Sequence, residues 1–163
     1  MAGDSTQESV VVSNRKIIVT QNMDYNIREM TIGDYEEAYH LWELTEGLCL
    51  DEGDSREAIG VYLKRNQGLC FVAYDDDRII GTVLCGHEGR RGILRHLAVK
   101  RGYRGKGIGR ALIKQSLLAL SKAGIKKCNT FVMDDNVEGR RFWEYMGWYI
   151  LEDNYRTFQI PTI

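Results

Sequence analysis

The stretch that most constrains this chain is a glycine-rich, basic segment between two apolar ones, residues 94–113. It opens with the apolar residues of a short buried strand, Leu94 and Leu97–Val99. The eight residues 102–109 contain four glycines, which are Gly102, Gly105, Gly107 and Gly109. Glycine has no Cβ, so it suits backbone that approaches a partner closely or adopts a positive φ. We therefore expect a strand, a tight loop and a helix that begins near Gly107.

Basic side chains lie among these glycines, and a helix that starts here would direct its free N–H groups and partial positive charge into the loop. Such an end binds anions, so we infer a phosphate or pyrophosphate ligand. A P-loop would need Ser or Thr after Lys106, where the chain has Gly107. A dinucleotide fingerprint starting at Gly105 fails at Arg110. A plain connector with solvated charges is the structural alternative.

The pattern that does fit is Arg-x-x-Gly-x-Gly, filled by Arg104, Gly107 and Gly109 after the strand residues Leu97–Val99. It resembles the acetyl-coenzyme A loop of the GNAT superfamily of N-acetyltransferases. A second stretch, residues 136–148, is similar to a helix that in this superfamily reads Asn-x-x-Ala-x-x-Phe-Tyr-x-x-x-Gly-Phe. The chain matches it at three positions and differs at three, with Gly for Ala and Trp for both the Tyr and the last Phe.

The resemblance spans residues 25–160 and implies an α/β fold. The expected sheet is mixed and mostly antiparallel, with six or seven strands, helices on both faces, and a splayed parallel pair near 93–99 and 126–133. The residue pattern itself predicts strands at 25–30, 68–74, 78–85, 93–99 and 125–133, and a closing hairpin at 148–151 and 155–160. It predicts helices at 34–46, 55–66, 107–123 and 136–146. Residues 1–22 form an N-terminal extension, either flexible or an added strand, and 23–163 form the N-acetyltransferase domain.

The same resemblance implies the site residues. The cofactor acetyl-CoA, released as CoA, would be bound by Leu97, Ala98, Val99, Arg104, Gly105, Lys106, Gly107, Ile108, Gly109, Arg110, Asn136 and Trp143. A general base is expected near the acceptor end, and the candidates are Glu88, His96 and His87. Trp143 stands where the family often has a tyrosine that protonates the thiolate, and indole is no usable acid. Tyr145 is a weak acid candidate because it points away around the helix.

The leading functional hypothesis is an acetyl-CoA-dependent N-acetyltransferase that moves the acetyl group directly from the thioester to a primary amine of a small molecule or peptide. Asp51, Glu52 and Asp54 lie in a loop that is either a solvated acidic turn or a rim for a cationic acceptor. The alternatives are a non-catalytic CoA-binding sensor or regulatory module and, less strongly supported, a phosphate-binding adaptor for nucleotides.

Composition excludes several other classes. The net charge of −1 argues against nucleic acid or an anionic membrane as partner. No apolar run approaches the length of a membrane span and no signal-peptide core is present, so we expect a cytoplasmic protein. Four scattered cysteines and three histidines lack metal-ligand spacing, so we expect no metal and reduced core thiols at Cys70, Cys85 and Cys128. The sequence is compatible with a homodimer and does not fix the oligomeric state.

Overall fold

The structure is a computed structural model that describes residues 25–151 and 159–160. Its strands are β1 (Asn26–Glu29), β2 (Phe71–Asp75), β3 (Arg78–His87), β4 (Gly92–Val99) and β5 (Cys128–Thr130). Its α-helices are α1 (Tyr35–Glu43), α2 (Arg56–Arg65), α3 (Ile108–Lys122) and α4 (Val137–Tyr145). Short 3₁₀ helices are η1 (Ile32–Asp34), η2 (Glu52–Asp54) and η3 (Arg101–Tyr103). The predicted extension at 1–22 lies outside the described residues.

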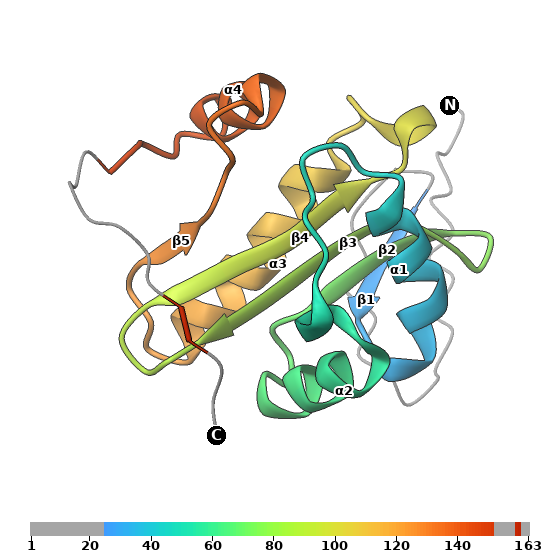
Figure 1. The fold of residues 1–163 in the computed structure, drawn as a ribbon, viewed down its shortest axis with the longest axis horizontal. Helices are drawn as coiled ribbons and strands as arrows, with labels where there is room; N and C mark the ends of the chain where they lie inside the picture. Colours follow the sequence, from blue (N-terminus) through green and yellow to red (C-terminus); the bar gives the residue numbers. More distant parts are fainter. Residues whose placement is uncertain (1–24, 152–158, 161–163) are drawn as a thin grey trace, which may run out of the picture. The chain divides into compact units, whose positions relative to one another are not determined.

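The described strands form one sheet in the order β1-β2-β3-β4-β5 (Figure 1). Neighbours are antiparallel except β4 and β5, which are parallel. This confirms the mixed sheet and the parallel pair, although five strands are described where six or seven were predicted. The strand predicted over 125–133 is only three residues long. Residues 148–151 of the predicted closing hairpin are not a strand, and 152–158 lie outside the described residues.

Helices cover both faces of this sheet, as predicted, with α1 and α2 on one face and α3 on the other (Figure 1). The side chains of β3 show how the faces divide. Thr82 bonds to a side chain of α1, whereas a Cβ on Gly81 would lie 3.0 Å from Cγ2 of Ile108 in α3. The absence of a side chain at Gly81 therefore lets the first turn of α3 pack directly on the sheet.

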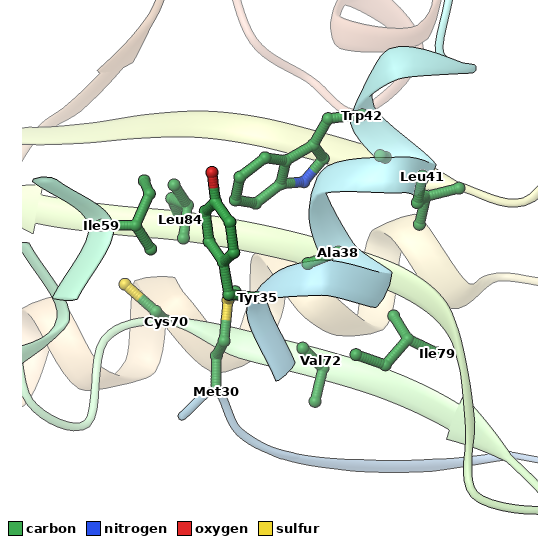
Figure 2. Packing of buried hydrophobic residues seen from close by; sticks show 11 residues of the cluster. Met30, Tyr35, Ala38, Leu41, Trp42, Ile59, Cys70, Val72, Ile79 and Leu84 are labelled. Atoms are coloured by element: carbon green, nitrogen blue, oxygen red, sulfur yellow. The ribbon is translucent and has the colours of Figure 1, made fainter. Parts of the chain in front are cut away.

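The core between α1, α2 and the sheet is built around two aromatic residues of α1. Figure 2 shows Trp42 and Tyr35 among aliphatic and sulfur-containing side chains from the helices and strands. Trp42 is completely buried, and its ring lies edge-on to that of Tyr35 at 6.5 Å. Burial of side chains of this size contributes about 1.5–3 kcal/mol each, so this cluster holds α1 firmly on the sheet.

Glycine sets both ends of α3. Gly107 is the N-cap and Gly124 follows the C-cap, each with a φ of 80°. At the C-terminal end, Gly124 N–H donates to the carbonyl of Ser121 and Ile125 N–H donates to that of Leu120. This pair of bonds is a Schellman motif, which needs a left-handed residue at Gly124. The predicted limits of this helix are thereby confirmed.

The chain divides into two compact units between Phe131 and Val132, and each is described by itself. The second unit contains α4, whose N-cap Asn136 accepts a hydrogen bond from the backbone N–H of Gly139 at 2.8 Å.

The cysteines are all free thiols, in agreement with the sequence; they are Cys49, Cys70, Cys85 and Cys128. In the described part of the chain, no helix has the length and apolar character required to cross a bilayer.

Candidate functional site

The loop between β4 and α3 is anchored at its base by three hydrogen bonds. Lys100 N–H donates to the carbonyl of Ile80 at 2.8 Å, and the Tyr103 hydroxyl donates to Oδ2 of Asp75 at 2.8 Å. Arg104 Nε donates to the carbonyl of Val99 at 3.1 Å. The guanidinium of Arg104 thus ties the loop back to the strand that leads into it.

Beyond Arg104 the backbone adopts an unusual conformation. Gly105 has a φ of 78° and Gly107 a φ of 80°, and an added Cβ at either position would meet nothing within 4 Å. Within the residues described, no side chain caps the N–H groups of Ile108 and Gly109 at the start of α3. These donors, the positive end of the helix and the open space around Gly105 and Gly107 are the features of a candidate anion site. The N–H of Arg104 already donates to Arg101, so the site begins at Gly105.

The strand before this loop has an open edge. β4 pairs with β5 only over Gly92–Leu94, and β5 ends at Thr130 while β4 continues to Val99. On its other side β4 stays paired with β3 as far as Val99. Among the described strands, none therefore pairs with Leu97, Ala98 or Val99 on the β5 side. Amide-bearing ligands bind to such an edge as an added strand does.

His96 lies in this unpaired part of β4, at a β-bulge. Thr82 of β3 pairs with Ala98 and Leu84 pairs with Arg95, so two residues of β4 lie opposite one of β3. His96 has a φ of 49°, in the left-handed region that few non-glycine residues adopt. The bulge means that simple alternation along the strand does not fix where the imidazole points. Its side chain is only 9% exposed.

A buried polar cluster surrounds His96. Its Nε2 lies 2.8 Å from Oδ1 of Asp54, a hydrogen-bond distance although the direction is not that of a hydrogen bond. The Thr82 hydroxyl donates to the carbonyl of His96 at 2.9 Å and accepts a bond from Trp42 Nε1 at 2.8 Å. The Trp42 and His96 rings meet edge to face at 4.7 Å. The Tyr35 hydroxyl donates to the carbonyl of Asp54.

This environment fixes the charge of the imidazole. Burial lowers the pKa of His96, the negative charge of Asp54 opposes this effect, and the positive charge of Arg95 adds to it. The net direction is downward, so His96 is neutral at pH 7 and has a lone pair that can accept a proton.

The other two base candidates lie elsewhere. His87 ends β3 and pairs with Gly92 at the start of β4, and Glu88 is in the hairpin between these strands. His87 Nδ1 accepts a bond from the N–H of Gly89, and Glu88 pairs with Arg90 at 3.5 Å. The length of β4 separates this hairpin from the anion site, about 23 Å at strand spacing. The structure therefore brings His96, but neither His87 nor Glu88, to the end of β4 that leads into the loop.

The candidates in α4 belong to the second unit. Oδ1 of Asn136 caps α4, and a Cβ on Gly139 would lie 2.6 Å from Asn136 Nδ2. The glycine in place of the family's alanine thus gives the Asn136 side chain room to fold over the helix start. The Trp143 ring lies 4.6 Å from that of Trp148, and Tyr145 is 76% exposed.

Sequence reasoning missed three members of the His96 cluster. Trp42 and Thr82 carry no chemical signal in the sequence, since Trp42 fits the apolar side of an amphipathic helix and Thr82 occurs in an apolar run. Asp54 was expected in a solvated turn or at an acidic rim with Asp51 and Glu52. Asp51 and Glu52 are exposed, but Asp54 is buried against His96, so the solvated turn is wrong for Asp54. The only hint in the sequence was that Asp54 is an acidic residue at a helix start, in a loop expected near the acceptor.

Comparisons with known proteins agree with this geometry. The sequence profile of the Acetyltransferase (GNAT) family matches residues 27–148. An acetyltransferase of Sodalis glossinidius is 34% identical over 110 residues, which are 68% of this chain and 77% of that protein. An uncharacterized N-acetyltransferase of Yersinia pestis matches with the same identity and coverage.

Solved structures show the same fold. PaiA N-acetyltransferase from Thermoplasma acidophilum, in complex with coenzyme A, has a TM-score of 0.71 at 23% identity, covering 81% of this chain and 94% of that one. Ard1 from Thermoplasma volcanium has a TM-score of 0.70 at 20% identity, covering 79% and 85%. From the matched profile and the similar proteins it follows that this chain belongs to the acetyltransferase (GNAT) family and is an acyltransferase.

Proposed function

We propose that the protein transfers an acetyl group from acetyl-CoA directly to a primary amine of a small molecule or peptide. The observation that carries this proposal is the N-terminal end of α3, where no described side chain caps the helix and the two left-handed glycines Gly105 and Gly107 have open space at their Cβ positions. An anion with several oxygens, such as the diphosphate of coenzyme A, matches the N–H donors of this helix end.

The residues present fit this cofactor. The backbone from Gly105 to Arg110 would hold the diphosphate, and each charge-assisted bond contributes about 1.5–3 kcal/mol. Lys106 lies with its ammonium 5.1 Å from the centre of the Tyr103 ring, so its charge stays near the loop. The unpaired edge at Leu97, Ala98 and Val99 would accept the amides of the pantetheine arm. Asn136 and Trp143 of the second unit remain candidates for further contacts.

Bound acetyl-CoA supplies an acyl group activated as a thioester. The chain has to supply a base, because a primary amine of pKa about 10 is almost entirely protonated at neutral pH. His96 is the strongest of the three base candidates, since it is neutral, buried and close to the open edge of β4. Removal of the amine proton by such a group contributes about 10²–10⁴ in rate. Tyr145 is retained as a weak candidate for the acid that protonates the thiolate.

Two measurements on the purified chain test the proposal. Calorimetry should show binding of acetyl-CoA, and a thiol reagent should detect free CoA when a panel of primary amines is added. ATP serves as the control ligand, since a general phosphate site would bind both molecules equally well. Binding of acetyl-CoA without thiol release from any amine would refute the transferase and favour a CoA-binding module. Absence of binding would refute the cofactor site itself.

A further inference from the structure

The pair formed by Asp54 and His96 joins two distant parts of the chain in a buried position. Asp54 belongs to η2 in the connection between α1 and α2, and His96 belongs to the bulge of β4. Both side chains are 9% exposed, and Oδ1 of Asp54 lies 2.8 Å from Nε2 of His96. A buried carboxylate is unfavourable unless other groups offset its desolvation, so this placement needs a reason.

Helix capping accounts for only one of the two oxygens of the Asp54 carboxylate. Oδ2 accepts the backbone N–H of Asp51 at 2.9 Å, which closes a capping box on η2. Oδ1 takes no part in that box and faces the imidazole instead. The backbone carbonyl of Asp54 is held in turn by the Tyr35 hydroxyl at 2.7 Å. The carboxylate is therefore fixed from two sides with one oxygen directed at His96.

The imidazole is held just as firmly. Among the described residues neither ring nitrogen makes a hydrogen bond of good direction, but Nε2 lies 2.8 Å from Oδ1 of Asp54. Thr82 binds the backbone carbonyl of His96 and Trp42 packs against the ring. In the part of the chain that is described, Nδ1 is buried and has no hydrogen-bond partner. A buried nitrogen without a hydrogen-bond partner is unusual, and it indicates a group that finds its partner in a ligand.

We propose, on the basis of the transfer to an amine proposed above, that Asp54 is a positioning residue that keeps the proton of His96 on Nε2 and leaves the Nδ1 lone pair to accept a proton from the acceptor. An N–H bond of the acceptor ammonium breaks, its electron pair stays on the amine nitrogen, and a new N–H bond forms at Nδ1. The Asp54 carboxylate stabilises the imidazolium, which afterwards returns the proton to solvent. The loose direction of the present Nε2 contact is common before substrate binds.

Asp54→Asn tests this role, because asparagine keeps the size of the side chain and an oxygen for the Asp51 N–H. Its amide would donate to Nε2, which forces the proton onto Nδ1 and removes the base. We expect kcat to fall by about 10²–10⁴ while the Kd for acetyl-CoA stays unchanged. Asp51→Asn is the matched control, since it removes the same charge from the same turn and leaves His96 facing a carboxylate. It should keep kcat within about threefold of wild type.

A second readout separates a positioning role from a structural one and does not depend on activity. Nitrogen-15 NMR of the imidazole should show the proton of His96 on Nε2 in the wild type and on Nδ1 in Asp54→Asn. The charged groups that act on this imidazole are Asp54 of η2, Asp51 at the N-cap of η2, and Arg95 on β4. A wild-type proton on Nδ1, or equal kcat in both variants, would overturn the proposal. Failure of the wild type to release thiol with any amine would instead overturn the proposed function, whatever the tautomer.

Discussion

Gly107→Glu should weaken acetyl-CoA binding sharply without unfolding the protein, and Gly124→Glu provides its control. Both glycines have a φ of 80° with nothing within 4 Å of an added Cβ, and they lie at opposite ends of α3. Each substitution therefore introduces the same backbone strain, about 1–2 kcal/mol. A carboxylate is stabilised at a helix N-terminus and destabilised at a C-terminus by about 0.3–1 kcal/mol. Gly107→Glu should accordingly be the more stable variant by about 0.6–2 kcal/mol.

Binding of acetyl-CoA should follow the opposite order, with Gly107→Glu the weaker binder. The carboxylate of Gly107→Glu stands before the donors of Ile108 and Gly109 and repels the diphosphate. Loss of a single charge-assisted hydrogen bond, about 1.5–3 kcal/mol, raises Kd by about 10- to 160-fold. Calorimetric titration with acetyl-CoA gives the Kd, and urea unfolding of the same samples gives the stability. If Gly107→Glu bound the cofactor as tightly as Gly124→Glu, the anion site would not be at the start of α3.

Three further expectations concern stability. Thr82→Val should lower the free energy of unfolding by about 2–6 kcal/mol, since the indole N–H of Trp42 and the carbonyl of His96 each lose a buried partner. Thr82→Ser keeps the hydroxyl and should retain most of that free energy. Urea titrations measure both variants. Because burial lowers the pKa of His96, the unfolded chain binds its proton more readily, so stability should fall as the pH drops below about 6.5. Urea titrations at pH 5.5 and 7.5 should show a smaller difference in His96→Gln, and an equal difference would contradict the assignment. Arg28→Ala should lower the free energy of unfolding by about 1.5–3 kcal/mol, because it removes two 2.7 Å hydrogen bonds to the largely buried carboxylate of Asp34. Arg28→Lys should lower the free energy of unfolding by less. Equal losses in the two variants would argue against the bidentate pair.

Local signals in the sequence predicted the glycine-rich loop between β4 and α3 and its flanking elements well. A left-handed glycine at each end of a periodic apolar stretch marks where α3 begins and ends, and both limits are confirmed. The turn at Asp76 and Asp77 was also readable from composition, and both residues have the positive φ of a tight hairpin turn. These features depend on residues close together in the chain, so a single sequence contains the information needed.

The environment of His96 was not predictable in the same way. Its partner Asp54 comes from a different element, and the pairing depends on how the connection between α1 and α2 crosses the sheet (Figure 1). The bulge at His96 also breaks the alternation on which a strand argument rests, and no glycine marks its positive φ. The length of the last described strand was missed for a related reason: β5 is three residues long, and its pairing with β4 ends at Leu94.

The hydrogen bond between Trp42 and Thr82 joins residues 40 positions apart, and Asp54 reaches His96 from a third element. The imidazole acquires its lowered proton affinity only after α1, η2, β3 and β4 have all assembled. A fragment that begins after η2 still contains His96, but there the ring would titrate as in a free peptide. Heating should therefore abolish proton transfer and tertiary structure in one cooperative step, and a split protein should regain this reactivity only through complementation of its two halves.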